Sequence, residues 1–102
     1  MIKVIVSYQN DLINSISVTN HAGNNNVCAS VSTSITITIN VLYSLDLLSC
    51  VEYSLKEGNF LLKVTKSNDN TQKVLSVLVQ AFDDLGIDYK KDISIKKEKT
   101  LC

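Results

Sequence analysis

The sequence predicts an α+β fold, a two-layer sandwich in which two main helices pack on a mixed or antiparallel sheet. Three observations support it: short β-branched segments of alternating polarity, two longer segments with helical periodicity, and turn signals between the strands. The elements follow in the order ββαββα, and a short last strand is expected after them. With 102 residues and no repeat or linker, the chain has the length of one domain, residues 1–102.

The first two strands are expected to form a hairpin. Residues 2–8 are β-branched and apolar, which favours a strand, and residues 9–11 (Gln-Asn-Asp) are typical of a turn. Residues 12–19 alternate in polarity and are predicted to be the paired second strand. Residues 20–26 (Asn-His-Ala-Gly-Asn-Asn-Asn) are rich in turn-forming residues and predict a loop.

Residues 28–49 carry two conflicting patterns. A strand-like alternation with Ser, Thr and Asn involves Ile35, Ile37, Ile39 and Val41. A helical stripe involves Val31, Ile35, Ile39, Leu42 and Leu45. Propensity alone favours a strand over residues 34–41, but no Gly, Pro or turn cluster interrupts about 22 residues, whereas strands average about 5–6. We therefore predict a helix over residues 28–48.

A second hairpin and a last strand are expected in the second half of the chain. Residues 50–56 and 60–66 flank Glu57-Gly58-Asn59, which is a hairpin turn signal. Ile93 and Ile95 alternate with polar residues, which indicates a short final strand.

A second helix is predicted between this hairpin and the last strand. Its apolar face contains Val74, Leu78, Ala81 and Leu85. Capping residues between 68 and 71 are expected to begin the helix, and Gly86 is placed just past its end. Asp83 and Asp84 lie beside the apolar face without a histidine partner, so we interpret them as solvated.

The charge composition argues against direct binding of nucleic acid. Ten lysines balance ten acidic residues, and the chain has no arginine, the residue that most often contacts phosphates and guanine edges through two hydrogen bonds. A nucleic-acid-binding domain normally shows a basic patch. We also expect no membrane span, because the sequence has no run of roughly eighteen apolar residues, and no secretory signal, because Met1–Val6 is too short and too quickly polar.

The cysteines Cys28, Cys50 and Cys102 indicate a reducing environment. An odd count without a signal peptide suggests free thiols in a cytoplasm. No pair has the close spacing of a zinc site, so no metal and no cofactor is implied. Cys50 opens a predicted strand and is expected in the core, whereas the terminal Cys102 is expected to be exposed.

The combination of His21 and Cys28 is the strongest chemical signal in the sequence. His21, the only histidine, follows a strand, and Cys28 comes seven positions later at the predicted start of a helix. Unpaired N–H groups and the helix dipole favour a thiolate there and could also stabilise an oxyanion. A histidine across a short loop can take the thiol proton. The alternative is a chance pairing in which the cysteine only fills the core.

The residue pattern around His21 and Cys28 favours the catalytic pair over a chance pairing. His21-Ala22-Gly23 is followed, after a short loop, by Val-Cys-Ala-Ser-Val-Ser at residues 27–32. This pattern resembles the ribosomal-processing cysteine proteases of bacteria, whose signature is Gly-His-Ala-Gly, a glycine-rich loop and Val-Cys-Ala-Ala-Val-Ser. The opening Met-Ile-Lys-Val, the two helices and the hairpin around Gly58 also fall where that family places them, so the resemblance covers nearly the whole chain.

The resemblance implies a function and site residues. His21 would be the general base and Cys28 the nucleophile, while Gly23 and Ser32 would contact the substrate. Members of the family remove an N-terminal extension from bacterial large-subunit ribosomal protein twenty-seven, cutting after an aromatic residue. They act as homodimers in the cytoplasm, so a second copy of the chain and this extension are the expected partners.

Two departures from the family pattern leave an alternative open. Asn20 stands where the family usually has glycine, and the loop before the cysteine is reduced to Asn24–Asn26. In the family this loop is longer, mobile and thought to gate the substrate cleft. The alternative is therefore a catalytically degenerate module that keeps the fold and binds a peptide or the ribosome. An RNA-binding ribosome factor is disfavoured by the neutral charge and the missing arginine.

Overall fold

The computed structural model describes residues 1–99, and over this range it confirms the predicted α+β class and the order ββαββαβ. The strands are β1 (Ile2–Gln9), β2 (Leu12–Thr19), β3 (Val51–Lys56), β4 (Asn59–Val64) and β5 (Ile93–Lys99). The helices are α1 (Asn25–Ser44), α2 (Asp69–Asp88) and the short 3-10 helix η1 (Leu48–Cys50). The prediction that Cys102 is exposed falls outside the described residues.

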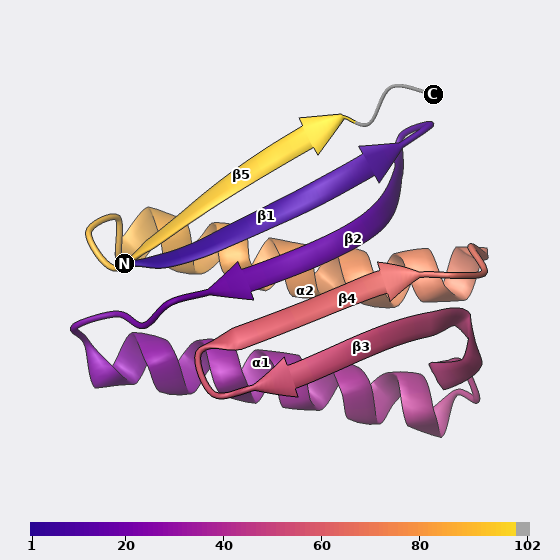
Figure 1. The fold of residues 1–102 in the computed structure, drawn as a ribbon, viewed down its shortest axis with the longest axis horizontal. Helices are drawn as coiled ribbons and strands as arrows, with labels where there is room; N and C mark the ends of the chain where they lie inside the picture. The colour runs from indigo at the N-terminus through magenta and orange to yellow at the C-terminus, as the bar shows by residue number, and fades with distance from the viewer. Residues whose placement is uncertain (100–102) are drawn as a thin grey trace.

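The strands form one mixed sheet, in the order β3-β4-β2-β1-β5. Three neighbouring pairs are antiparallel, and only β5 runs parallel to its neighbour β1. Both helices lie on the same face of the sheet, with α2 behind β1 and β2 and α1 near the β3 edge (Figure 1). The molecule is therefore a two-layer sandwich with one open sheet face.

The alternation of polarity along the strands explains which face the helices cover. Successive side chains of a strand point to opposite faces, so every second residue can enter one core. In β1 the buried residues are Ile2, Val4 and Val6, and in β4 they are Phe60 and Leu62. These side chains, together with buried residues of both helices, form a single hydrophobic core.

The disputed segment is a helix, as predicted, although it begins and ends earlier than expected. Its buried residues are spaced three or four apart: Val27, Val31, Ile35, Thr38 and Leu42. The interspersed hydroxyl groups are absorbed by the helix, because Ser30, Ser34, Thr36 and Thr38 each donate to the carbonyl four residues earlier. The alternation of Ser and Thr with apolar residues, which favoured a strand, is therefore compatible with a helix.

The start of α1 is set by Asn24. Its side-chain oxygen accepts a hydrogen bond from the N–H of Asn26 at 2.9 Å, the arrangement of a helix N-cap. The helix consequently begins at Asn25, three residues before the predicted start at Cys28.

The predicted end of the second helix was wrong. Helix α2 continues through Gly86 to Asp88. A Cβ atom at Gly86 would lie 2.7 Å from Cδ1 of Ile95 in β5. Glycine is thus present because the helix and the last strand approach each other closely, and not because the helix stops there.

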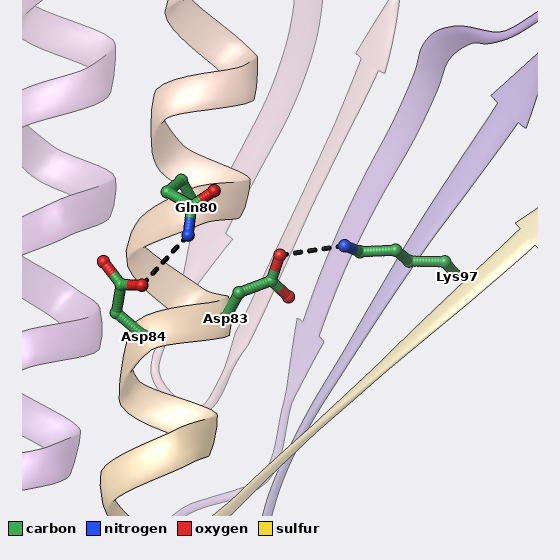
Figure 2. Close-up of polar contacts among 4 residues, drawn as sticks. All are labelled: Gln80, Asp83, Asp84 and Lys97. Carbon is green, nitrogen blue, oxygen red and sulfur yellow. Dashed lines mark hydrogen bonds and ion pairs between the residues drawn. The ribbon is translucent and has the colours of Figure 1, made fainter.

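The sequence suggested that Asp83 is only solvated, but in the structure this side chain has a partner. Its carboxylate accepts a hydrogen bond and forms an ion pair with Nζ of Lys97 at 2.8 Å, which joins α2 to β5 (Figure 2). The neighbouring Asp84 accepts a hydrogen bond from Nε2 of Gln80 at 2.9 Å. The hydrogen bond to Asp83 raises the pKa of Lys97 above its ordinary value of 10.5.

Helix α1 has the length and apolar composition of a helix that can cross a membrane. The core helix of a globular domain passes the same test, and α1 places Val27, Val31, Ile35 and Leu42 in the core. The expectation that the chain has no membrane span came from the absence of a long apolar run, and it stays a prediction.

Candidate active site

A cavity of about 340 Å³ opens at one end of the sandwich and contains both predicted catalytic residues, His21 and Cys28. The end of β2, the start of α1 and the β3–β4 hairpin come together at this end of the molecule (Figure 1). The inner wall consists of buried apolar side chains: Ile2, Val18, Val31, Ile35 and Phe60. The β3–β4 hairpin adds exposed polar residues to the lining: Lys56, Glu57 and Asn59.

Cys28 is half-buried in the first turns of α1, and its thiol contacts the backbone of Ala22. The Ala22 N–H donates to Sγ at 3.2 Å, and Sγ is 3.5 Å from the Ala22 carbonyl oxygen, to which the thiol can donate. When the thiol loses its proton, the N–H remains as a donor to the negative sulfur. The same N–H can therefore bind the sulfur in its nucleophilic form, as a charge-assisted hydrogen bond.

The start of α1 offers fewer free N–H groups to the site than the sequence suggested. Asn24, as the cap, accepts hydrogen bonds through its carbonyl oxygen from the N–H groups of Val27 (3.2 Å) and Cys28 (3.3 Å). The N–H of Cys28 is therefore paired, so it is not one of the free N–H groups that were expected to stabilise an oxyanion. The physical reason is the earlier start of the helix, which makes Cys28 its fourth residue and pairs its N–H within the first turn.

Two backbone hydrogen bonds fix the segment that carries His21. The Asn20 N–H donates to the carbonyl oxygen of Gly58 at 3.0 Å, and the His21 carbonyl accepts from the amino group of Met1 at 3.1 Å. Asn20 has a φ of 71°, in the left-handed region where glycine and asparagine are favoured. Asparagine is thus a compatible replacement for the glycine that the family pattern has before the histidine.

The imidazole of His21 is exposed and lies against Gly58, whose missing Cβ would come within 2.6 Å of Nε2. Among residues 1–99, no hydrogen bond joins the ring to the Cys28 thiol. Hydrogen bonds between catalytic groups are often long in a free enzyme and shorten when substrate binds. The two residues share one cavity, and a change in the ring position is needed for proton transfer.

The two residues predicted to contact substrate occupy different places. Ser32 lies one helical turn after Cys28, lines the cavity, and has a hydroxyl without a hydrogen bond among the described residues. Gly23 is exposed on the loop and is not part of the cavity wall. Within residues 1–99, no three His, Cys, Asp or Glu side chains are grouped closely enough to hold a metal ion.

Sequence reasoning missed the contributions of Ala22 and of the β3–β4 turn. The contact of Ala22 is made by its backbone, which no residue type encodes. The turn was predicted, but its position beside His21 depends on the pairing of β4 with β2, in which Thr19 lies opposite Asn59. The only sequence signal was the glycine of the turn itself.

Comparisons with known proteins agree on family and fold. The sequence profile of the family described as cysteine protease Prp matches residues 1–94. The ribosomal processing protease Prp from Staphylococcus aureus, solved with a substrate peptide, is 17% identical with a TM-score of 0.87, over 96% of this chain and 100% of that chain. Its complex with a covalently linked product peptide gives 20% identity and a TM-score of 0.83 over the same shares.

A third solved structure has the same fold. SMU.848 from Streptococcus mutans is 20% identical with a TM-score of 0.80, over 98% of this chain and 96% of that chain. The search of curated proteins found no match. At identities of 17–20% the solved structures establish only the fold. The evidence for the family is the profile match over residues 1–94.

Proposed function

The chain belongs to the cysteine protease Prp family, and from this premise we propose that it removes the N-terminal extension of a bacterial large-subunit ribosomal protein in the cytoplasm. As a member of this family it is a cysteine protease. In the proposal, Cys28 is the nucleophile and His21 is the general base. The observation that supports these roles is the shared cavity, in which the Cys28 thiol receives an N–H hydrogen bond from the residue after His21.

The proposed reaction proceeds through an acyl-enzyme. His21 takes the thiol proton, and the sulfur of Cys28 attacks the carbonyl carbon of the scissile bond. The tetrahedral intermediate collapses when the imidazolium gives its proton to the leaving amine, which departs with the C-terminal part of the substrate. A water molecule, deprotonated by His21, then hydrolyses the thioester, releases the extension as a carboxylate and restores the thiol.

The shape and chemistry of the cavity support a peptide with a large apolar side chain. Its inner wall is formed by aliphatic residues and Phe60, and Ser32 and Thr36 add hydroxyl groups on α1. Such a cavity suits a cut after an aromatic residue. The related Staphylococcus aureus protease was solved with a substrate peptide and with a covalently linked product peptide.

A homodimer is part of the proposal. Three exposed apolar residues, spaced four apart, form a stripe: Ile37 and Val41 of α1 and its C-cap residue Leu45. An exposed apolar stripe of this kind often marks an interface, and a twofold copy covers the same patch on both subunits.

The test is cleavage of a synthetic peptide that spans the end of the extension and the start of the mature ribosomal protein from the same genome. We expect one cut, read by mass spectrometry, and none with the Cys28→Ala variant. Binding of the peptide without any cut would instead favour the degenerate module, which the shortened loop at Asn24–Asn26 makes the second candidate. Binding is measured by fluorescence anisotropy of the labelled peptide.

A further inference from the structure

The turn between β3 and β4 is shaped around the ring of His21. Gly58 has a φ of +71°. If it carried a Cβ, the three nearest atoms would all belong to that ring: Nε2 at 2.6 Å, Cδ2 at 3.3 Å and Cε1 at 3.3 Å. Real Cβ atoms essentially never approach within 3.0 Å, so ring and side chain cannot share this space.

The backbone holds the turn in this position. The Gly58 carbonyl accepts the hydrogen bond from the Asn20 N–H at 3.0 Å, one residue before the histidine. Next to it, Thr19 of β2 lies opposite Asn59 of β4, and Lys56 of β3 pairs with the same Asn59. Because the sheet fixes both segments, the turn cannot retreat to make room for a side chain, and the ring has to move.

We propose that Gly58 is a positioning residue for the reaction, because its missing side chain provides the space in which the His21 imidazole lies beside the Cys28 cavity. The inference rests on the proposed function, in which His21 is the base. Proton transfer requires the ring to turn from this space toward the thiol, so a Cβ that occupies the space shifts the position from which the ring reaches the sulfur. A misplacement of about 1 Å can reduce a rate by about 100-fold. Gly58 also lines the cavity, but the buried apolar inner wall does not include it, so a Cβ at position 58 lowers the rate of the chemical step while that wall and the fold remain.

Strain in the turn must be separated from displacement of the ring. Most residues are disfavoured at positive φ, but asparagine tolerates it, as Asn20 and Asn10 do here. Gly58→Asn thus adds a Cβ at low backbone cost. Asn10→Ala is the matched control, because it introduces strain at a φ of 52° in the β1–β2 turn, which is not part of the cavity.

The first measurement is the steady-state cleavage of the extension peptide together with the melting temperature. For Gly58→Asn we expect kcat to fall by about 100-fold with KM and melting temperature close to the native values. For Asn10→Ala we expect a lower melting temperature and native kcat. A native kcat in Gly58→Asn would overturn the proposal.

The second measurement asks whether Gly58 acts through His21. In the His21→Ala background, Gly58→Asn should cause no further loss of kcat, because the group that it displaces is already absent. An equal loss in both backgrounds would show that the glycine serves only the turn, and the positioning role would be overturned.

The third measurement does not need a cleavable substrate, so it separates this inference from the proposed function. The alkylation rate of Cys28 by iodoacetamide should fall in Gly58→Asn to the value of His21→Ala. If the native chain cuts no peptide but shows this pattern, the proposed function fails and the positioning role stands. If either variant is alkylated as fast as the native chain, the positioning role is overturned.

Discussion

At the scale of single residues, the environment of Cys28 combines a half-buried sulfur with one backbone donor and one backbone acceptor from Ala22. The N–H group favours the negative sulfur, whereas the carbonyl oxygen accepts only from the neutral thiol. The site therefore permits both states that the reaction needs, and His21 is the side chain in the cavity that can carry the proton between them.

The first prediction concerns the selective reactivity of Cys28. We expect iodoacetamide to modify Cys28 faster than Cys50, because Cys50 is 8% exposed and its sulfur accepts a hydrogen bond from Asn68. Replacing His21 by Ala should slow this modification and lower peptide cleavage by about 10²- to 10⁴-fold.

The labelled positions are identified by mass spectrometry after chymotryptic digestion. Trypsin is unsuitable because no lysine or arginine lies between Lys3 and Lys56, so both cysteines stay on one peptide. Equal labelling of Cys28 and Cys50 in the native chain would contradict the prediction.

At the scale of the elements, the start of α1 determines how Cys28 is presented. Asn24 caps the helix with its side chain and pairs with the N–H of Cys28 through its carbonyl oxygen. Loss of the side-chain cap leaves an N–H without a partner and loosens the first turn, which is the turn that leads to the nucleophile.

The second prediction compares the caps of the two helices. Asn24→Ala and Asn68→Ala should each lower the free energy of unfolding by about 1 kcal/mol, because each removes an oxygen that accepts from a first-turn N–H. Only Asn24→Ala should also lower the rate of cleavage, since α2 does not line the cavity. Urea denaturation and peptide cleavage are measured for both variants, and equal activity in the two would refute the link between cap and site.

The third prediction concerns the ion pair between α2 and β5. The hydrogen bond to Asp83 raises the pKa of Lys97 in the folded chain above 10.5, its value in the unfolded chain. The ion pair therefore stabilises the fold fully at pH values below 10.5, and this stabilisation is lost as the pH rises through the pKa of Lys97 in the folded chain. Both side chains are partly exposed, so Lys97→Met should cost only about 0.2–1 kcal/mol at pH 7.

Urea denaturation at neutral and at strongly alkaline pH tests this ion pair. The difference between the native chain and Lys97→Met should shrink at the alkaline pH. Lys96→Met is the control, because Lys96 pairs with Glu98 on its own strand and is 73% exposed. A difference that grows with pH would contradict the assignment.

The elements also show where sequence patterns are sufficient. Length correctly favoured a helix for α1, because twenty uninterrupted residues are too many for one strand. Its first residue was missed, since Asn24, Asn25 and Asn26 are all loop-forming and only the structure shows which of them is the cap. Gly86 was misplaced because a glycine that admits a close neighbour looks, in sequence, like one that ends a helix.

At the scale of the whole molecule, the site exists because distant segments meet at one end of the sandwich (Figure 1). The motif identified His21 and Cys28 because they are close in sequence. The inner wall was beyond prediction, since Ile2, Val18 and Phe60 come from three strands whose order in the sheet is not written in their composition. The contact of Gly58 with His21 was also beyond prediction, because the pairing of β4 with β2 places the two residues side by side.

The open surfaces of this sandwich lead to the last prediction, which concerns association. Ile37, Val41 and the C-cap residue Leu45 are 57%, 38% and 53% exposed along the second half of α1, the helix that also carries Cys28. If a second copy covers this stripe, light scattering should give twice the chain mass of 11.3 kDa at micromolar concentration.

A charge within the stripe should prevent this association, because the partner surface would have to desolvate it. Ile37→Lys should therefore shift the measured mass to that of one chain, while its helix content in circular dichroism stays native. Val77→Lys is the matched control, since Val77 is 69% exposed on α2, away from the stripe, and its replacement should leave the mass doubled. A native chain with the mass of a monomer would refute the dimer, and a doubled mass in Ile37→Lys would place the interface on another surface.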